Sequence, residues 1–126
     1  MAIVRSFRDL HVYKRLYNTM LLVMKEVLPS LPKEERFSLS DQMRRAAKAP
    51  LAIIAEGYAK KNYKRDWIKY IRDAIGECNE MIVHLSCCRD IYGDRVDAVL
   101  VDKLINEYDI SGKQLYRLAE SWKGKE

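Results

Sequence analysis

The residues with the clearest chemical potential are cations, and they are concentrated in one stretch of the chain. Positions 44 to 72 hold nine lysines and arginines against two acidic residues, Glu56 and Asp66, a formal net charge of +7. The 126-residue chain as a whole carries +5, so the remainder sums to −2. The nine cations are Arg44, Arg45, Lys48, Lys60, Lys61, Lys64, Arg65, Lys69 and Arg72. Clustered cations without local carboxylates are typical of surfaces that bind nucleic-acid phosphates.

The spacing of the cations indicates that they lie on helices. Four of the last five follow one another at intervals of four, four and three, which places these four in one stripe on a helix. This stripe consists of Lys61, Arg65, Lys69 and Arg72. Tyr58 and Tyr63 add aromatic rings that can stack on unpaired bases. Two alternatives remain open, a solvated helix face without a ligand and a surface that recognises a protein partner.

Catalytic and metal-binding patterns are not recognisable in the sequence. The chain has no G-x-S-x-G, Walker loop or H-E-x-x-H motif. Glu56 lies in an apolar stretch, so we expect it to be either buried with a raised pKa or paired with an arginine of a neighbouring helix. His84 and Cys88, with Cys87 beside them, form half of a zinc site, and the other half is missing. We therefore predict that the protein is not an enzyme and has no metal and no cofactor.

Apolar residues recur at intervals of three and four, which is the period of α-helices. We predict four helices, over residues 8–28, 38–60, 63–91 and 95–122. Pro29 is expected to end the first helix. Pro50 lies inside the second and is expected to kink or break it.

Polar residues before these helices predict how the helices begin. Ser38 with Asp41 resembles a capping box at the start of the second helix. Asn62 is expected to cap the third helix, and Asp94 with Asp97 to open the fourth.

Short connections force consecutive helices to run antiparallel. The sequence therefore predicts one all-α domain, residues 1–126, folded as an antiparallel up-down-up-down four-helix bundle. Several apolar residues fall off the core stripes, and we expect a subunit interface there. They are Val12, Leu22, Val23, Val96, Val99 and Ile110.

Because no segment reads as a signal peptide or a membrane span and the three cysteines suit a reducing compartment, we expect a cytoplasmic protein without membrane contact.

Three segments of the chain resemble a known family. They are Ser6-Phe7-Arg8-Asp9-Leu10-His11-Val12-Tyr13, Leu39-Ser40-Asp41-Gln42-Met43-Arg44-Arg45-Ala46-Ala47 and Ile54-Ala55-Glu56-Gly57-Tyr58. Their order and spacing are similar to those of the bacterial four-helix-bundle proteins encoded by ribosomal RNA intervening sequences. The accessory variability proteins of diversity-generating retroelements look like the same fold. The chain departs from the family's usual pattern at Lys48-Ala49-Pro50-Leu51-Ala52-Ile53 and at Gly76-Glu77.

The resemblance implies a homopentameric ring of four-helix bundles without enzymatic activity. It also implies a structural role for four positions that stay in register with the family's pattern. These are Pro50, Glu56, Gly57 and Gly76. It places Arg44, Arg45 and Lys48 on the basic functional surface. We therefore predict an oligomer that binds nucleic acid, with RNA favoured by the resemblance. The alternative is an accessory protein of a diversity-generating retroelement that binds a reverse transcriptase together with template RNA.

Overall fold

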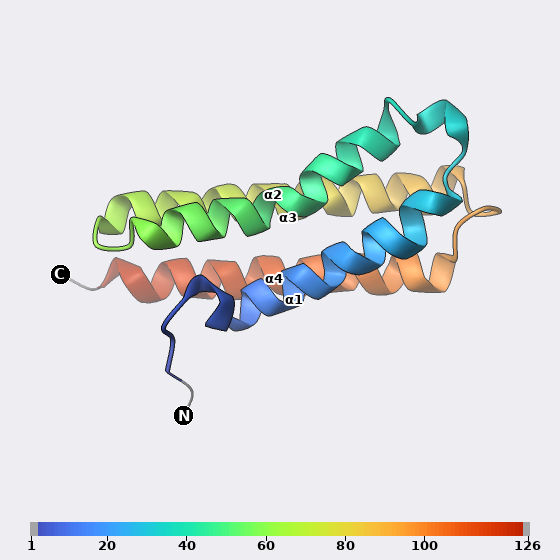
Figure 1. Cartoon of the computed structure of the whole chain (residues 1–126). Helices are drawn as coiled ribbons and strands as arrows, with labels where there is room; N and C mark the ends of the chain where they lie inside the picture. Colours follow the sequence, from blue (N-terminus) through green and yellow to red (C-terminus); the bar gives the residue numbers. More distant parts are fainter. Residues whose placement is uncertain (1–2, 125–126) are drawn as a thin grey trace.

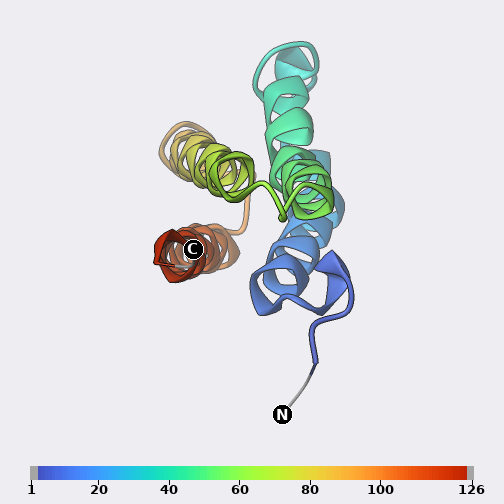
Figure 2. The same cartoon turned by 90° about the vertical axis from the view of Figure 1, so that its left-hand side faces the viewer.

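The computed structural model describes residues 3–124, and the four predicted helices are present (Figure 1). They are α1 (His11–Leu22), α2 (Leu39–Ala59), α3 (Lys64–Ile91) and α4 (Ala98–Lys123). The described residues contain no strand, so the prediction of an all-α fold with four helices is confirmed. Consecutive helices run in opposite directions (Figure 1). Helix α3 packs chiefly on α4 and α2, and α1 packs on α4 and less extensively on α2 (Figure 2).

The first predicted helix is shorter than expected because it is interrupted at both ends. Phe7–Asp9 forms a separate 3-10 turn, and Leu10 then adopts extended backbone before α1 begins. Beyond α1 the chain widens into a π-turn over Val23–Val27 and then tightens into a 3-10 turn over Leu28–Ser30. Pro29 explains why the helix ends in this 3-10 turn, because proline has no N–H for an α-helical hydrogen bond and its ring clashes with the carbonyl four residues earlier.

Helix α2 starts within one residue of the prediction, but the expected capping box is wrong. The Ser38 side chain makes no capping hydrogen bond. Instead, the Glu35 carboxylate accepts the backbone N–H of Leu39 at 3.3 Å and also the hydroxyl hydrogen bond of Tyr92. Glu35 thereby ties the start of α2 to the end of α3.

The starts of α3 and α4 also differ in detail from the prediction. Tyr63, rather than Asn62, occupies the position before α3, and no side chain caps that helix. Helix α4 begins three residues later than predicted, because Asp97 is its cap and accepts the N–H of Leu100 at 3.1 Å. Asp94 lies in the turn before this cap.

Pro50 does not break α2, which is continuous from Leu39 to Ala59. The proline is buried and leaves the carbonyl four residues earlier without its usual helical donor. Figure 1 shows α2 bending along its length, as expected for a helix that contains a proline.

The glycines at positions 57 and 76 have very different surroundings. A Cβ on Gly57 would lie 2.4 Å from the Cβ of Tyr70 and 3.0 Å from a ring carbon of Trp67, so α2 and α3 approach too closely there for any side chain. A Cβ on Gly76 would have no atom within 4 Å. No contact within the described chain therefore requires glycine at position 76, and the packing role implied for Gly76 is not seen.

The core includes three valines that the sequence assigned to a subunit interface. Val12, Val23 and Val96 are 5%, 0% and 7% exposed, so that assignment is wrong for them. The buried face of the first helical segment follows Val12, Leu16, Thr19, Val23 and Val27, at spacings of four, three, four and four. The start of α1 after extended Leu10 and the following π-turn set this register. No helix of residues 3–124 is long and apolar enough to cross a membrane.

Candidate nucleic-acid interface

The antiparallel course of the helices gathers distant cations at one end of the bundle. The starts of α1 and α3 and the ends of α2 and α4 meet there (Figure 1). Residues 3–18, 50–77 and 111–123, which we call the cationic end, hold thirteen lysines and arginines and six acidic residues, a formal net charge of +7. The other half, residues 19–49 and 78–110, holds nine lysines and arginines and eleven acidic residues, a formal net charge of −2. The molecule is therefore polarised along its long axis.

The nine predicted cations do not form one surface. Six of them lie in the cationic end, namely Lys60, Lys61, Lys64, Arg65, Lys69 and Arg72. The other three belong to the opposite half of α2. Because a helix rises about 1.5 Å per residue, the twelve residues from Lys48 to Lys60 separate the two groups by roughly 18 Å.

Arg45 does not present a free charge, although the sequence assigned it to the binding surface. Its guanidinium donates to the carboxylate of Glu77 at 3.1 Å and forms a second ion pair with Glu80, both on α3. The hydrogen bond and charge of Glu77 raise the pKa of Arg45, and Glu80 adds to the effect. Arg45 is thus a link between α2 and α3. Arg44 lies 3.8 Å from the carboxylate of Asp41, and Lys48 is exposed.

A chain of hydrogen bonds involves Lys60 and Glu56 at the end of α2. The Lys60 ammonium donates to the Tyr70 hydroxyl at 3.0 Å, and that hydroxyl donates to the Glu56 carboxylate at 3.1 Å. Glu56 is exposed, so the expectation that it is buried or paired with an arginine is wrong. The reason is the register of α2, in which Ile54 and Gly57 occupy the buried face and Glu56 points to solvent.

Aromatic rings contact a cation of the α2–α3 turn and connect this turn to α3 and α4. The Lys61 ammonium lies 4.1 Å from the ring centroid of Tyr58, within cation–π range. The edge of Tyr58 meets Trp67 at 6.0 Å, and Trp67 meets Trp122 of α4 at 6.4 Å. These contacts join the turn and Lys61 to α3 and α4.

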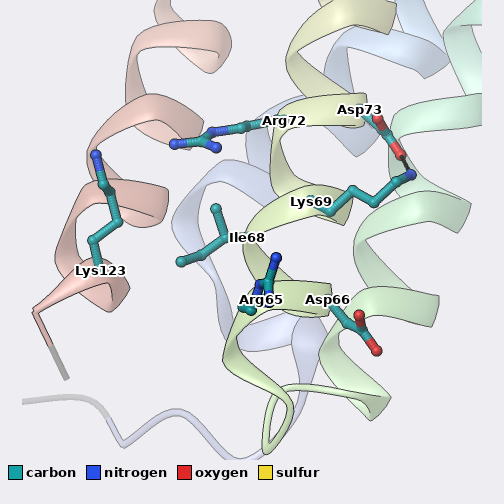
Figure 3. Close-up of a pocket in the computed structure, with 7 residues that line it drawn as sticks. All are labelled: Arg65, Asp66, Ile68, Lys69, Arg72, Asp73 and Lys123. Carbon is teal, nitrogen blue, oxygen red and sulfur yellow. Dashed lines mark hydrogen bonds and ion pairs between the residues drawn. The ribbon is translucent and has the colours of Figure 1, made fainter. Parts of the chain in front are cut away.

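A hollow of about 730 Å³ lies between the start of α3 and the end of α4 (Figure 3). It is lined by the cations Arg65, Lys69, Arg72 and Lys123, the carboxylates of Asp66 and Asp73, and the apolar Ile68. Figure 3 shows Arg72 reaching from α3 toward α4, where the Lys123 side chain extends along the helix. Within residues 3–124, neither arginine forms an ion pair with a carboxylate. We call this the arginine hollow.

The arginine hollow divides the stripe that the sequence predicted on the third helix. Lys69 turns away from the two arginines and pairs with Asp73 at 3.0 Å (Figure 3). Lys123, which pairs with Glu120 at 3.1 Å, was not among the predicted cations. Its position could have been predicted from the antiparallel course of the predicted helices, because that course places the last turn of α4 beside the first turn of α3. Lys64 adds a direct link there, donating to the carbonyl of Lys123 at 3.4 Å.

The half zinc site suggested by the sequence has other contacts. His84 lies 3.2 Å from the Glu80 carboxylate, and the Cys88 thiol lies 3.4 Å from the sulfur of Met43 in the core. Burial raises the pKa of Cys88 to about 12, which keeps the sulfur in its thiol form at neutral pH. Among residues 3–124, no group of three or more His, Cys, Asp or Glu side chains is placed to hold a metal ion.

The fold defines the chain as a small helical bundle, and the residues at one end of it carry a formal net charge of +7. The family model of the 23S rRNA-intervening sequence proteins matches residues 8–117, which include α1, α2, α3 and most of α4. The chain therefore belongs to the 23S rRNA-intervening sequence protein family, and the resemblance seen in the sequence is confirmed. A search of curated proteins found no matching relative.

Proposed function

We propose that this protein is a non-catalytic RNA-binding bundle that acts in the cytoplasm and uses its cationic end. The observation that carries this proposal is the arginine hollow, where Arg65 and Arg72, two helical turns apart on α3, form no ion pair with a carboxylate of the described chain. A guanidinium matches the geometry of a phosphate and binds it with two parallel hydrogen bonds. RNA is favoured over DNA because the family takes its name from a sequence within 23S rRNA.

Binding at this end would follow the phosphate backbone rather than read bases. Lys60 and Lys61 lie at the α2–α3 turn, at the same end of the bundle as the arginine hollow, so a bound backbone that extends from the hollow across this end would meet further cations. Each neutralised phosphate releases condensed counterions, and the affinity then falls linearly with salt on logarithmic axes. The proposal therefore predicts strongly salt-dependent binding to structured RNA.

The test is charge reversal with a matched control at the opposite end. Arg65→Glu with Arg72→Glu is compared with Lys33→Glu with Arg36→Glu, which changes the net charge equally but alters the loop before α2. Fluorescence anisotropy against a structured RNA is measured between about 50 and 200 mM salt. We expect the first variant to bind more than tenfold more weakly, with a salt slope shallower by about 1.5 for two lost phosphate contacts. Equal losses in both variants would contradict the proposal.

Arg45 provides a second control within the predicted set. Because it is already paired with Glu77 and Glu80, Arg45→Gln is expected to leave RNA affinity within about twofold of wild type. A loss as large as that of the arginine-hollow variant would show that the ion pairs open to admit RNA. A protein that binds RNA only when a reverse transcriptase is present would instead fit the retroelement alternative.

We also propose that the protein assembles with copies of itself, as the homopentamer that the family resemblance implies. Large apolar side chains remain exposed on α3 and α4, among them Val83 at 60% and Val99 at 82%. Ile91 and Tyr116 are exposed in the same two helices. Burial of such side chains against another copy would remove apolar area from water. Native mass spectrometry measures the assembly directly, and a monomer at micromolar concentration would contradict this part of the proposal.

A further inference from the structure

A second hollow, of about 420 Å³, lies along α1 and has no role in the function proposed above. Its lining residues are Arg8, Tyr13, Lys14, Tyr17 and Asn18. Tyr13 and Tyr17 stand one helical turn apart, with ring centroids 6.2 Å apart and an interplanar angle of 29°, so their rings are stacked. Tyr17 is 45% exposed. We call this the tyrosine hollow.

The turn before α1 holds one wall of the tyrosine hollow in place. Ser6 and Asp9 form a reciprocal capping box, in which the Asp9 carboxylate accepts the N–H of Ser6 at 3.0 Å. This turn places Phe7 edge-on against Tyr13, with ring centroids 5.1 Å apart, and Arg8 over the Phe7 ring at 4.6 Å. The ring of Tyr13 is therefore fixed from one side, and Tyr17 stacks on a fixed partner.

The charges and polar groups around these rings suit a nucleotide. Arg8 and Lys14 are exposed, and neither forms an ion pair with a carboxylate of the described chain. Asn18 is exposed and offers both an amide donor and a carbonyl acceptor. An aromatic face flanked by cations and an amide is the chemistry that holds an unpaired base, with stacking on the base and cations on its phosphates. An apolar peptide would offer no anionic or polar partner to the two cations and the amide.

The tyrosine hollow also connects physically with the proposed RNA-binding end. Phe7 meets the ring of Tyr58 at 6.5 Å, and Lys61 lies over that same ring at 4.1 Å. Side-chain contacts are thus continuous from Tyr17 to the cations of the α2–α3 turn. A strand of RNA leaving that turn would find the tyrosine hollow within the same end of the molecule.

We propose that the tyrosine hollow binds an unpaired base of single-stranded RNA. Tyr17 supplies the stacking face, Asn18 hydrogen bonds to the edge of the base, and Arg8 and Lys14 contact the flanking phosphates. The inference rests on the proposed RNA-binding function and extends it, because it makes the preferred ligand an RNA with a single-stranded segment. A duplex cannot use this site, since its bases are stacked on one another.

The test compares Tyr17→Leu with Phe37→Leu, which also replaces an exposed aromatic ring but lies in the turn before α2, outside the tyrosine hollow. The probes are a fluorescein-labelled 12-nucleotide oligouridine and a 12-base-pair RNA duplex, with affinities measured by anisotropy at one salt concentration. We expect Tyr17→Leu to weaken oligouridine binding about 5- to 150-fold, the range for loss of one base–aromatic stack. Duplex binding is expected to stay within twofold. Phe37→Leu should change neither affinity.

Two further variants guard against a folding defect. Tyr17→Phe keeps the ring and should bind like wild type, and Asn18→Ala, at an exposed helical position, should reproduce a smaller loss for oligouridine alone. Unchanged oligouridine binding by Tyr17→Leu, or an equal loss for both probes, would overturn the tyrosine hollow as a base site. If the wild type bound neither probe, the proposed function itself would fail. If binding depended on Arg65 and Arg72 but not on Tyr17, only the present inference would fail.

Discussion

Alanine substitutions at two helical glycines should change stability in opposite directions. At Gly57, alanine gains about 1 kcal/mol of helix propensity, because glycine is a poor helix former. Its Cβ would, however, lie 2.4 Å from the Cβ of Tyr70, and neither atom can rotate away. Overpacking a close helix crossing costs about 1–3 kcal/mol, and a contact this short belongs at the upper end of that range. We expect Gly57→Ala to lower the free energy of unfolding by about 2 kcal/mol.

Gly76→Ala provides the matched comparison within the same fold. Gly76 lies inside α3 and is exposed, and a Cβ there would meet no atom within 4 Å. Only the propensity gain remains, so this variant should be more stable than wild type by up to about 1 kcal/mol. Urea denaturation followed by circular dichroism at a fixed protein concentration measures both changes.

The free energies of unfolding of the two variants should therefore differ by about 3 kcal/mol. A Gly57→Ala protein as stable as wild type would refute the argument that the α2–α3 approach requires glycine. Destabilisation by Gly76→Ala would show that another molecule occupies the space beside α3. In that case native mass spectrometry should record a change in the assembly.

Two further predictions concern titratable groups in the fold. Burial raises the pKa of Cys78 and Cys88 to about 12, so iodoacetamide at pH 8 should modify only the half-buried Cys87 in the native protein and all three thiols after unfolding, as counted by intact-protein mass spectrometry. The hydrogen bond from Tyr92 lowers the pKa of Glu35 below its ordinary value of 4.5, and the folded state therefore binds this proton less readily than the unfolded state. That stabilisation is present above pH 4.5 and is lost as the pH falls through the lowered pKa, so Glu35→Gln should lessen the drop in the urea midpoint between pH 6 and pH 3.

The long helices could be predicted from the sequence because their apolar period extends over twenty or more residues. The starts of α2, α3 and α4 differ from the prediction by three residues at most. The first helix was harder, because a 3-10 turn, extended backbone at Leu10 and a π-turn at Val23–Val27 shift which residues face the core. Val12 and Val23 are core residues rather than the expected interface residues, because the buried stripe of α1 passes through the polar Thr19 and leaves Tyr17 exposed. A stripe chosen by apolar residue type cannot anticipate a buried threonine.

The cations of the candidate site show which electrostatic properties follow from the sequence and which depend on tertiary structure. Charge could be counted along the chain, and the antiparallel course of the helices would have placed Lys123 near the first turn of α3, although the predicted cations did not include it. The neutralisation of Arg45 could not be anticipated, because it depends on how α2 is rotated against α3. That rotation is constrained where Gly57 meets Tyr70, twelve residues from Arg45 along the same helix. A change at Gly57 should therefore alter which carboxylates Arg45 meets, and a stability defect there would be accompanied by a change in the charge presented by α2.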